Sequence, residues 1–222
     1  MYKALIYKEW IKIRWYFLIV LGVSLWQLTA FFLEQRELFE LKHAVVIWNS
    51  IIFKKIQFYS EVKYSAVLAG MVLALAQFIP ETLKQRLRLL FHLPVAHNNS
   101  VYTMIGVGLT GVVFIVFINV VVMSWIIATY YPWDVVRSAL LTSAPWFISG
   151  LVAYFWVVLA ALEPNQVRKI LFGGAGFLIL SLYLSSCSIN AFEHSLWRYL
   201  LLALLLAPTA ILPAHRFKRG LS

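Results

Sequence analysis

The sequence predicts an all-α integral membrane protein with six transmembrane helices, and three observations support this prediction. Of the 222 residues, 62% are hydrophobic and 13% are charged, whereas soluble domains carry about 45–50% apolar and about 25% charged residues. Six apolar runs are long enough to cross the roughly 30 Å hydrocarbon layer of a membrane as helices. None of these runs contains Lys, Arg, Asp or Glu, so contact with lipid explains the excess of hydrophobic residues.

The first expected span is a retained helix and not a cleavable signal peptide, because its apolar run of 19 residues is too long and no A-x-A site follows it. The third run exceeds the length that a membrane requires, which predicts a tilted or protruding helix. In chain order, the expected spans are Trp15–Leu33, Tyr64–Pro80, Val101–Tyr131, Ala139–Leu162, Ile170–Ile189 and Tyr199–Pro213.

The distribution of basic residues predicts the orientation. Six spans place both termini on one side of the membrane, together with the connections at 81–99 and 163–169, and this side carries 12 of the 19 Lys and Arg. Because basic loops stay in the cytoplasm, both termini are expected to be cytoplasmic, in a multi-pass protein of the inner (plasma) membrane. The formal charge of +10 is thus explained by topology, and nucleic-acid binding is not needed to account for it.

The segment before the first span, residues 1–14, predicts an interfacial helix. On a helical wheel Lys8, Glu9 and Lys12 share one face, and Trp10 lies on an apolar face with two isoleucines. Lys3 and Arg14 intrude on the apolar side, but long basic side chains can snorkel and Trp suits the headgroup layer. An ordinary basic flank of the first span is the alternative.

The longest connection, residues 34–63, is expected on the outer side. Part of it is apolar enough to suggest a seventh span, but Lys54 and Lys55 fall in the middle of that part. Two lysines at the bilayer centre would cost about 2.5–3.5 kcal/mol each. An amphipathic helix lying on the membrane or packed against the bundle is therefore expected.

Motifs of enzyme chemistry are weak. The G-x-G-x-x-G match at 106–111 lies inside an apolar helix with no strand before it, so it indicates close helix packing. The sequon at Asn98–Ser100 is better explained by helix capping. Cys187 is the single cysteine, and the five histidines form no ligand motif, so no metal, cofactor or catalytic residue is predicted.

The stretch PETLKQRLRLLFHLP, residues 80–94, predicts a basic amphipathic helix between the second and third spans. Its apolar arc is formed by leucines, and Pro80 and Pro94 are expected to bound it. A basic interfacial helix with a role only in orientation is the simplest interpretation. The residues on its polar arc are Glu81, Lys84, Gln85, Arg88 and His92.

A family resemblance favours a more specific interpretation. An amphipathic N-terminal segment, six spans, and a Glu at the membrane exit followed by bases and LLFHLPVAHNNSVY together resemble the permease subunit of type-2 ATP-binding cassette (ABC) exporters. The resemblance covers the whole chain, with residues 81–95 as its moderately specific part. The long 34–63 connection with its Lys-Lys pair departs from the family pattern.

The resemblance implies a function for both amphipathic segments. The helix at 81–93 would be the coupling helix, which presents Glu81, Lys84, Gln85, Arg88 and His92 to a separate ATPase subunit. The segment at 1–14, with Lys8, Trp10 and Lys12, would be the elbow helix. The implied partners are two ATP-binding cassette ATPase subunits, which would carry ATP and Mg²⁺, and a second permease copy or paralogue.

Two other classes of function stay open on the sequence. A membrane scaffold or assembly subunit without transport activity could recruit a soluble partner through the same helix. A membrane-embedded enzyme would need a polar cluster near an interface, and only Ser185–Ser188 with His194 offers one, although serines that end an apolar helix usually cap or pack. The substrate of a transporter is not readable from the apolar spans.

Overall fold

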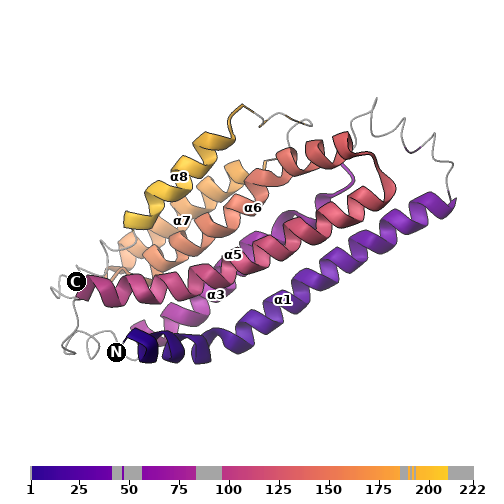
Figure 1. Cartoon of the computed structure of the whole chain (residues 1–222). Helices are drawn as coiled ribbons and strands as arrows, with labels where there is room; N and C mark the ends of the chain where they lie inside the picture. The colour runs from indigo at the N-terminus through magenta and orange to yellow at the C-terminus, as the bar shows by residue number, and fades with distance from the viewer. Residues whose placement is uncertain are drawn as a thin grey trace.

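The computed structural model describes residues 2–41, 47, 57–83, 97–185, 190, 192 and 194–209 of the chain. These residues form six α-helices and one short 3-10 helix, and no strand occurs among them (Figure 1). The all-α prediction is confirmed. The elements are α1 (Tyr2–Leu41), η1 (Ser60–Tyr64), α3 (Ser65–Leu83), α5 (His97–Tyr130), α6 (Trp133–Leu162), α7 (Gln166–Tyr183) and α8 (Leu196–Thr209).

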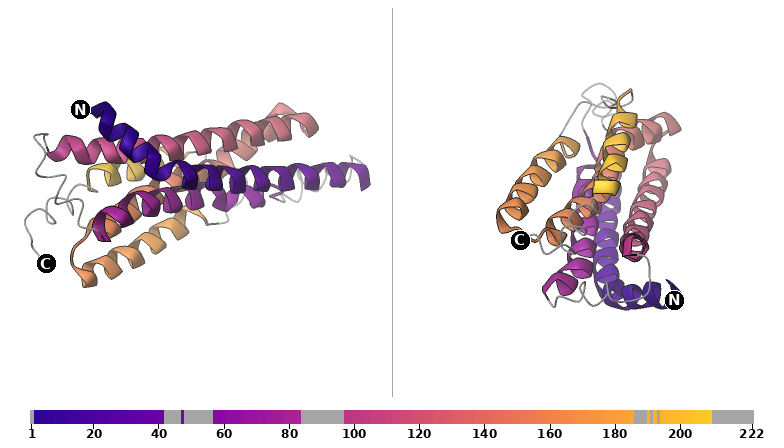
Figure 2. Two further views of the ribbon diagram at one scale, coloured as in Figure 1. Left: turned by 90° about the horizontal axis from the view of Figure 1, so that it is seen from below. Right: turned by 90° about the vertical axis from the view of Figure 1, so that its left-hand side faces the viewer.

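The helices form an elongated bundle in which successive helices run in opposite directions (Figures 1 and 2). Helix α6 lies at its centre and packs against α3, α5, α7 and α8, while α1 packs against α3 and α5. The beginning of α1, the end of α3 and the beginning of α5 therefore lie at the same end of the bundle.

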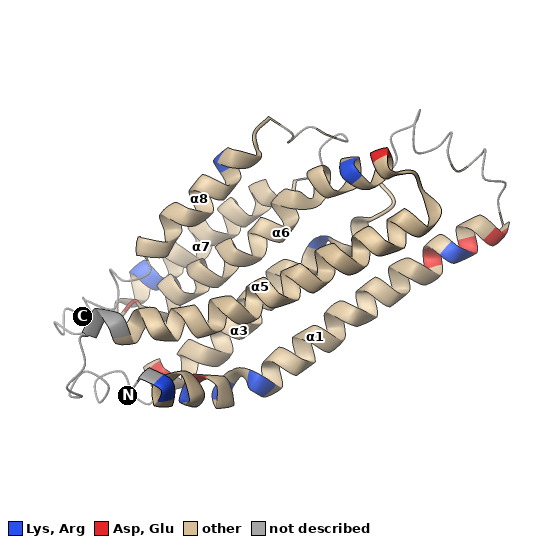
Figure 3. Ribbon diagram, viewed as in Figure 1, with Lys and Arg blue, Asp and Glu red and all other residues tan. Residues whose placement is uncertain are grey.

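Four of the helices are long and apolar enough to cross a membrane, which indicates a multi-pass membrane protein. Most of the described Lys, Arg, Asp and Glu residues gather toward the two ends of the bundle, as Figure 3 shows. The remaining two helices, α7 and α8, have 18 and 14 residues. The apolar stretches of the four long helices are Lys3–Leu41, Ser60–Thr82, Ser100–Tyr130 and Trp133–Leu162.

Helix α1 differs from the predicted arrangement, in which residues 1–14, the span at Trp15–Leu33 and the connection at 34–63 are separate segments. It is one continuous helix of 40 residues that covers the first two segments from Tyr2 onward and ends at Leu41, within the third. No Pro interrupts it, and the ion pair between Arg36 and Glu40, four residues apart, supports its last turns. Figure 2 shows that its first turns run at an angle to the rest of the helix.

The helix that contains the second expected span does not end at Pro80. Helix α3 continues through Pro80 to Leu83, so Glu81 belongs to its last turn. Proline has no backbone N–H, so it removes one hydrogen bond of the helix. Pro80 lies only three residues before the end of α3, so the loss in helix stability is small. The remainder of the expected coupling helix, residues 84–93, lies outside the described residues.

The other predicted bounds shift by a few residues. Helix α5 begins at His97, so Asn98–Ser100 lie in its first turn and do not precede it as capping residues. Helix α6 begins six residues before Ala139, and α7 ends at Tyr183, before the predicted Ile189. The earlier starts of α5 and α6 are consistent with the tolerance of polar side chains near a helix end, where their polar tips can reach water.

Close packing between α3 and α6 depends on two glycines. A Cβ atom at Gly70 would collide with the backbone carbonyl of Gly150, and one at Gly150 would lie 2.6 Å from the carbonyl oxygen of Ala66. Small residues let helix backbones approach in this way where hydrophobic driving force is weak. The predicted packing role of the glycines at 106–111 is confirmed for Gly108 and Gly111 only, since a Cβ at Gly106 would meet open space.

Candidate functional site

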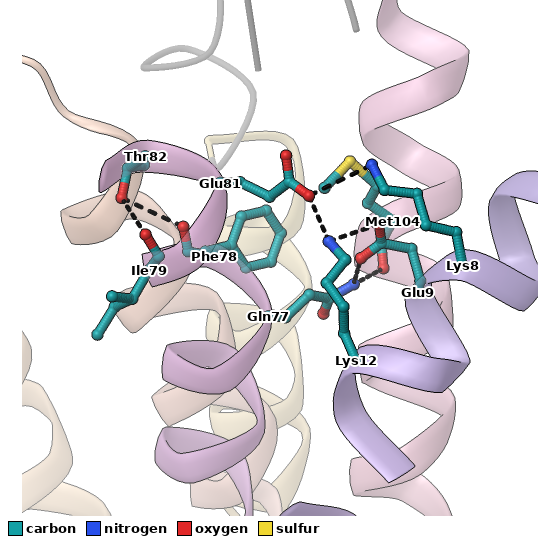
Figure 4. A network of polar contacts seen from close by, with 9 residues as sticks. All are labelled: Lys8, Glu9, Lys12, Gln77, Phe78, Ile79, Glu81, Thr82 and Met104. Carbon is teal, nitrogen blue, oxygen red and sulfur yellow. Dashed lines mark hydrogen bonds and ion pairs between the residues drawn. The ribbon is translucent and has the colours of Figure 1, made fainter. Parts of the chain in front are cut away.

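A network of charged and polar side chains joins α1, α3, α5 and α6 at the end of the bundle where α1 begins. We call it the terminal network. Figure 4 shows the members from the first turns of α1 and the last turns of α3, with the Met104 residue of α5. A further member lies in the C-terminal half of α6 and contacts a second carbonyl group of α5. The side chains are Lys8, Glu9, Lys12, Gln77, Glu81 and Tyr154.

Two lysines and two glutamates form its charged part. The Lys12 Nζ lies 2.5 Å from Glu81 Oε1 and 2.7 Å from Glu9 Oε1, so it bridges the two carboxylates. The Lys8 Nζ lies 3.4 Å from the same oxygen of Glu81. Both carboxylate side chains are 0% exposed, and the formal charges balance.

A neutral relay extends the network toward α5 and α6. The Gln77 amide donates to Glu9 Oε2 over 3.1 Å and to the Met104 carbonyl over 2.6 Å. The Tyr154 hydroxyl donates to Gln77 Oε1 over 2.8 Å. It also lies 3.1 Å from the Ile105 carbonyl. Four helices thus share one set of polar contacts, which fixes their positions relative to one another near this end of the bundle.

The energetics of such a network are asymmetric. A complete buried ion pair adds little net stability, because the desolvation of the charges offsets their attraction. Removing one partner costs about 3–5 kcal/mol, since the other charge remains buried without compensation. The network therefore acts mainly as a device that specifies how α1, α3 and α6 fit together.

One oxygen of the network has no partner among the described residues. The Glu81 Oε2 atom is buried and makes no hydrogen bond there. In Figure 4 this oxygen points away from Lys12 and Gln77. Glu81 thus has one carboxylate oxygen tied to α1 and one available for a further donor.

The predicted site residues divide between described and undescribed positions. Glu81, Lys8 and Lys12 meet in the terminal network. Trp10 is 44% exposed and lies between α1 and α5, in a separate groove. The other four residues of the expected ATPase face, Lys84, Gln85, Arg88 and His92, lie outside the described residues.

Sequence reasoning missed three members of the network. Periodicity groups Glu9 with Lys8 and Lys12 on one face, but it does not reveal that the Glu9 carboxylate is fully buried while Lys8 stays exposed. Gln77 lies four residues before Glu81, and this spacing, which places both on one face of α3, was a usable signal. No sequence signal points to Tyr154, which lies 77 residues from its partner Gln77.

A second, uncharged set of polar contacts joins α1, α3 and α5 farther along the bundle. We call Ser24, Ser65 and Asn119 the central cluster. The Asn119 amide donates to Ser24 Oγ over 2.7 Å and to the Ile115 carbonyl over 2.8 Å. Ser65 Oγ donates to Asn119 Oδ1 over 3.2 Å. All three side chains are buried, and none carries a charge.

Within the described part of the chain, no group of three or more His, Cys, Asp or Glu side chains could hold a metal ion. Comparison of the chain with protein-family models, curated protein sequences and solved structures gave no match. The geometry described above is therefore what supports a proposal about function.

Proposed function

We propose that the chain is the membrane-spanning permease subunit of an ATP-driven type-2 ABC exporter. In this proposal all six helices cross the plasma membrane, both termini are cytoplasmic, and a second permease copy or paralogue completes the substrate path. Separate ATPase subunits carry ATP and Mg²⁺ and dock on the segment at 81–93. The N-terminal turns of α1 act as the elbow helix beside them.

The observation that carries the proposal is the attachment of Glu81. This residue lies at the point where the basic segment begins, and its carboxylate is fixed to Lys12 over 2.5 Å. A force applied to the segment at 81–93 would therefore act on the N-terminal part of α1 as well as on α3. A helix that only oriented the protein would not require a buried ionic attachment at its first residue.

The terminal network also offers a route by which such a force reaches the rest of the bundle. Gln77 connects Glu9 of α1 to the backbone of α5, and Tyr154 adds α6. On the proposed mechanism, ATP binding closes the ATPase subunits and displaces segment 81–93. The four connected helices then move together and open a path for the substrate.

The experiment is a pull-down of the tagged full-length chain from its native cell in mild detergent. Bound proteins are identified by mass spectrometry, and the eluate is assayed for ATP hydrolysis. The expected result is a stoichiometric ATP-binding cassette subunit that is lost in Arg88→Glu. The variant Arg216→Glu, which makes the same charge change in the C-terminal tail, should retain it.

The outcome that contradicts the proposal is equally specific. Recovery of the chain without an ATPase, or with a partner that binds no nucleotide, would favour the scaffold or assembly subunit. Equal recovery of the ATPase with Arg88→Glu and with Arg216→Glu would show that the ATPase does not dock on the polar arc of segment 81–93.

A further inference from the structure

An open apolar groove of about 730 Å³ lies between α1 and α5. Its walls are aromatic and aliphatic side chains with two threonines and two glycines. Trp10 and Phe114 on its rims are 44% and 51% exposed. The groove is lined by Ile6, Trp10, Phe17, Thr103, Gly106, Val107, Thr110, Gly111 and Phe114.

The depth of the groove depends on Gly106 and on the way Thr110 is held. A Cβ atom at Gly106 would meet nothing within 4 Å, so the absence of a side chain leaves open space there. The Thr110 hydroxyl donates to the Gly106 carbonyl over 2.8 Å, which satisfies its polar group within α5. The surface that remains is suited to a hydrocarbon chain.

The length of the groove matches one leaflet of a membrane. Along α5 it extends from Thr103 to Phe114, which corresponds to about 16 Å of helix. The hydrocarbon layer of a bilayer is roughly 30 Å thick, so the groove covers about half of it. It starts near the end of the bundle where α1 begins, and that end carries the bases of the N-terminal segment.

Two cations flank the groove. Lys3 and Arg14 lie seven residues before and four residues after Trp10, so helical periodicity places them on the groove side of α1. Both are exposed. Lys8 and Lys12 neutralise Glu9 and Glu81 in the terminal network, whereas neither Lys3 nor Arg14 forms an ion pair with a described residue. Two positive charges without an acidic partner among the described residues thus lie beside the groove.

We propose that the groove binds an anionic phospholipid of the leaflet next to the N-terminal end of α1. One acyl chain lies along Trp10, Gly106 and Phe114, and the phosphate lies among Lys3, Arg14 and the headgroup layer. The charge selects the headgroup, and the walls of the groove hold the chain. This proposal does not depend on the transport function proposed above.

The test is native mass spectrometry of the detergent-purified full chain with added phosphatidylglycerol or phosphatidylcholine. The wild-type chain should retain phosphatidylglycerol in preference to phosphatidylcholine, and each of Lys3→Gln and Arg14→Gln should reduce this preference about fivefold. Arg198→Gln is the matched control, because Arg14 and Arg198 each lie 5.5 Å from the ring centroid of an adjacent Trp.

A second variant tests the groove itself. Gly106→Leu should abolish retention of the lipid, whereas Gly174→Leu on α7 should not, although a Cβ at either glycine meets open space. Circular dichroism establishes that both variants remain helical. Equal retention of the two lipids by the wild-type chain, or unchanged retention by Gly106→Leu, would overturn the proposal. A lipid-free dimer lost in Gly106→Leu would also overturn it, by assigning the groove to a second copy.

Discussion

Helices α1, α3 and α5 are joined by side-chain hydrogen bonds in two places, and the two differ in charge. The terminal network uses two lysines and two glutamates at one end of the bundle. The central cluster uses Ser24, Ser65 and Asn119 and lies about 18 Å farther along α1 than Lys12. Both sets are buried, so burial alone does not explain the difference.

The position in the membrane explains it. An ionised side chain near the middle of a bilayer costs several kcal/mol, whereas one near the interface can be hydrated or reach the headgroups. The same three helices can therefore be joined by charges at their ends but only by neutral groups nearer the middle. The charged contact is the more sensitive to damage, because a broken ion pair leaves a buried charge.

The largest effect is expected from Lys12→Ala. This change leaves Glu9 and Glu81 buried, with only Lys8 near one of them. We expect a loss of about 3–5 kcal/mol in the free energy of unfolding. Unfolding in mixed micelles by titration with sodium dodecyl sulfate provides the measurement, with Lys3→Ala as the control. If Lys12→Ala and Lys3→Ala lower the free energy of unfolding equally, the terminal network does not contribute to stability as described.

A smaller effect is expected from Tyr154→Phe, which removes the hydroxyl and preserves the ring. The hydroxyl donates to Gln77 Oε1, and its loss leaves that buried oxygen without a partner, at a cost of about 1–2 kcal/mol. The same titration measures the cost. In a background of Gln77→Leu the cost should shrink, and a full cost in that background would show that Tyr154 acts independently of Gln77.

Asn119→Ala should cost less. Hydrogen bonds between transmembrane helices contribute about 0.6 kcal/mol on average and at most about 1.7. The hydroxyls of Ser24 and Ser65 can then bond to carbonyls of their own helices, so no charge is left uncompensated. We expect a loss of roughly 0.5–1.5 kcal/mol. A loss as large as that of Lys12→Ala would contradict the distinction between the two sites.

The smallest effect is expected at the other end of α1. Arg36 and Glu40 form an ion pair over 2.7 Å, but their side chains are 61% and 62% exposed. Exposed pairs of this spacing contribute about 0.3–0.5 kcal/mol. Arg36→Gln should therefore lower stability by less than about 0.5 kcal/mol, and a larger loss would indicate that this end of the helix is packed against other groups.

The comparison also marks the limit of prediction from the sequence. Composition and apolar runs suffice for the all-α class and for the approximate places of the helices. They fail at Pro80 and at residues 34–41, because a helix can continue beyond the apolar run into a segment where charged and polar residues interrupt the hydrophobic pattern. The boundary of a hydrophobic run is a boundary of the membrane and not of the helix.

The terminal network was only partly predictable for a different reason. Periodicity placed Lys8, Glu9 and Lys12 together on one face, which is correct. It could not decide whether that face meets water or a neighbouring helix. The answer depends on Glu81, which lies 69 residues away from Lys12, and pairings over such distances carry no local pattern.

The measurement that tests the account most directly compares the two sites in one functional experiment. ATPase subunit recovered with the tagged chain is quantified for the wild type, Lys12→Ala and Asn119→Ala. If Glu81 must be held by Lys12 for segment 81–93 to dock, recovery falls with Lys12→Ala and is unchanged with Asn119→Ala. Equal recovery from both variants would contradict the claim that the terminal network supports docking of the ATPase subunit.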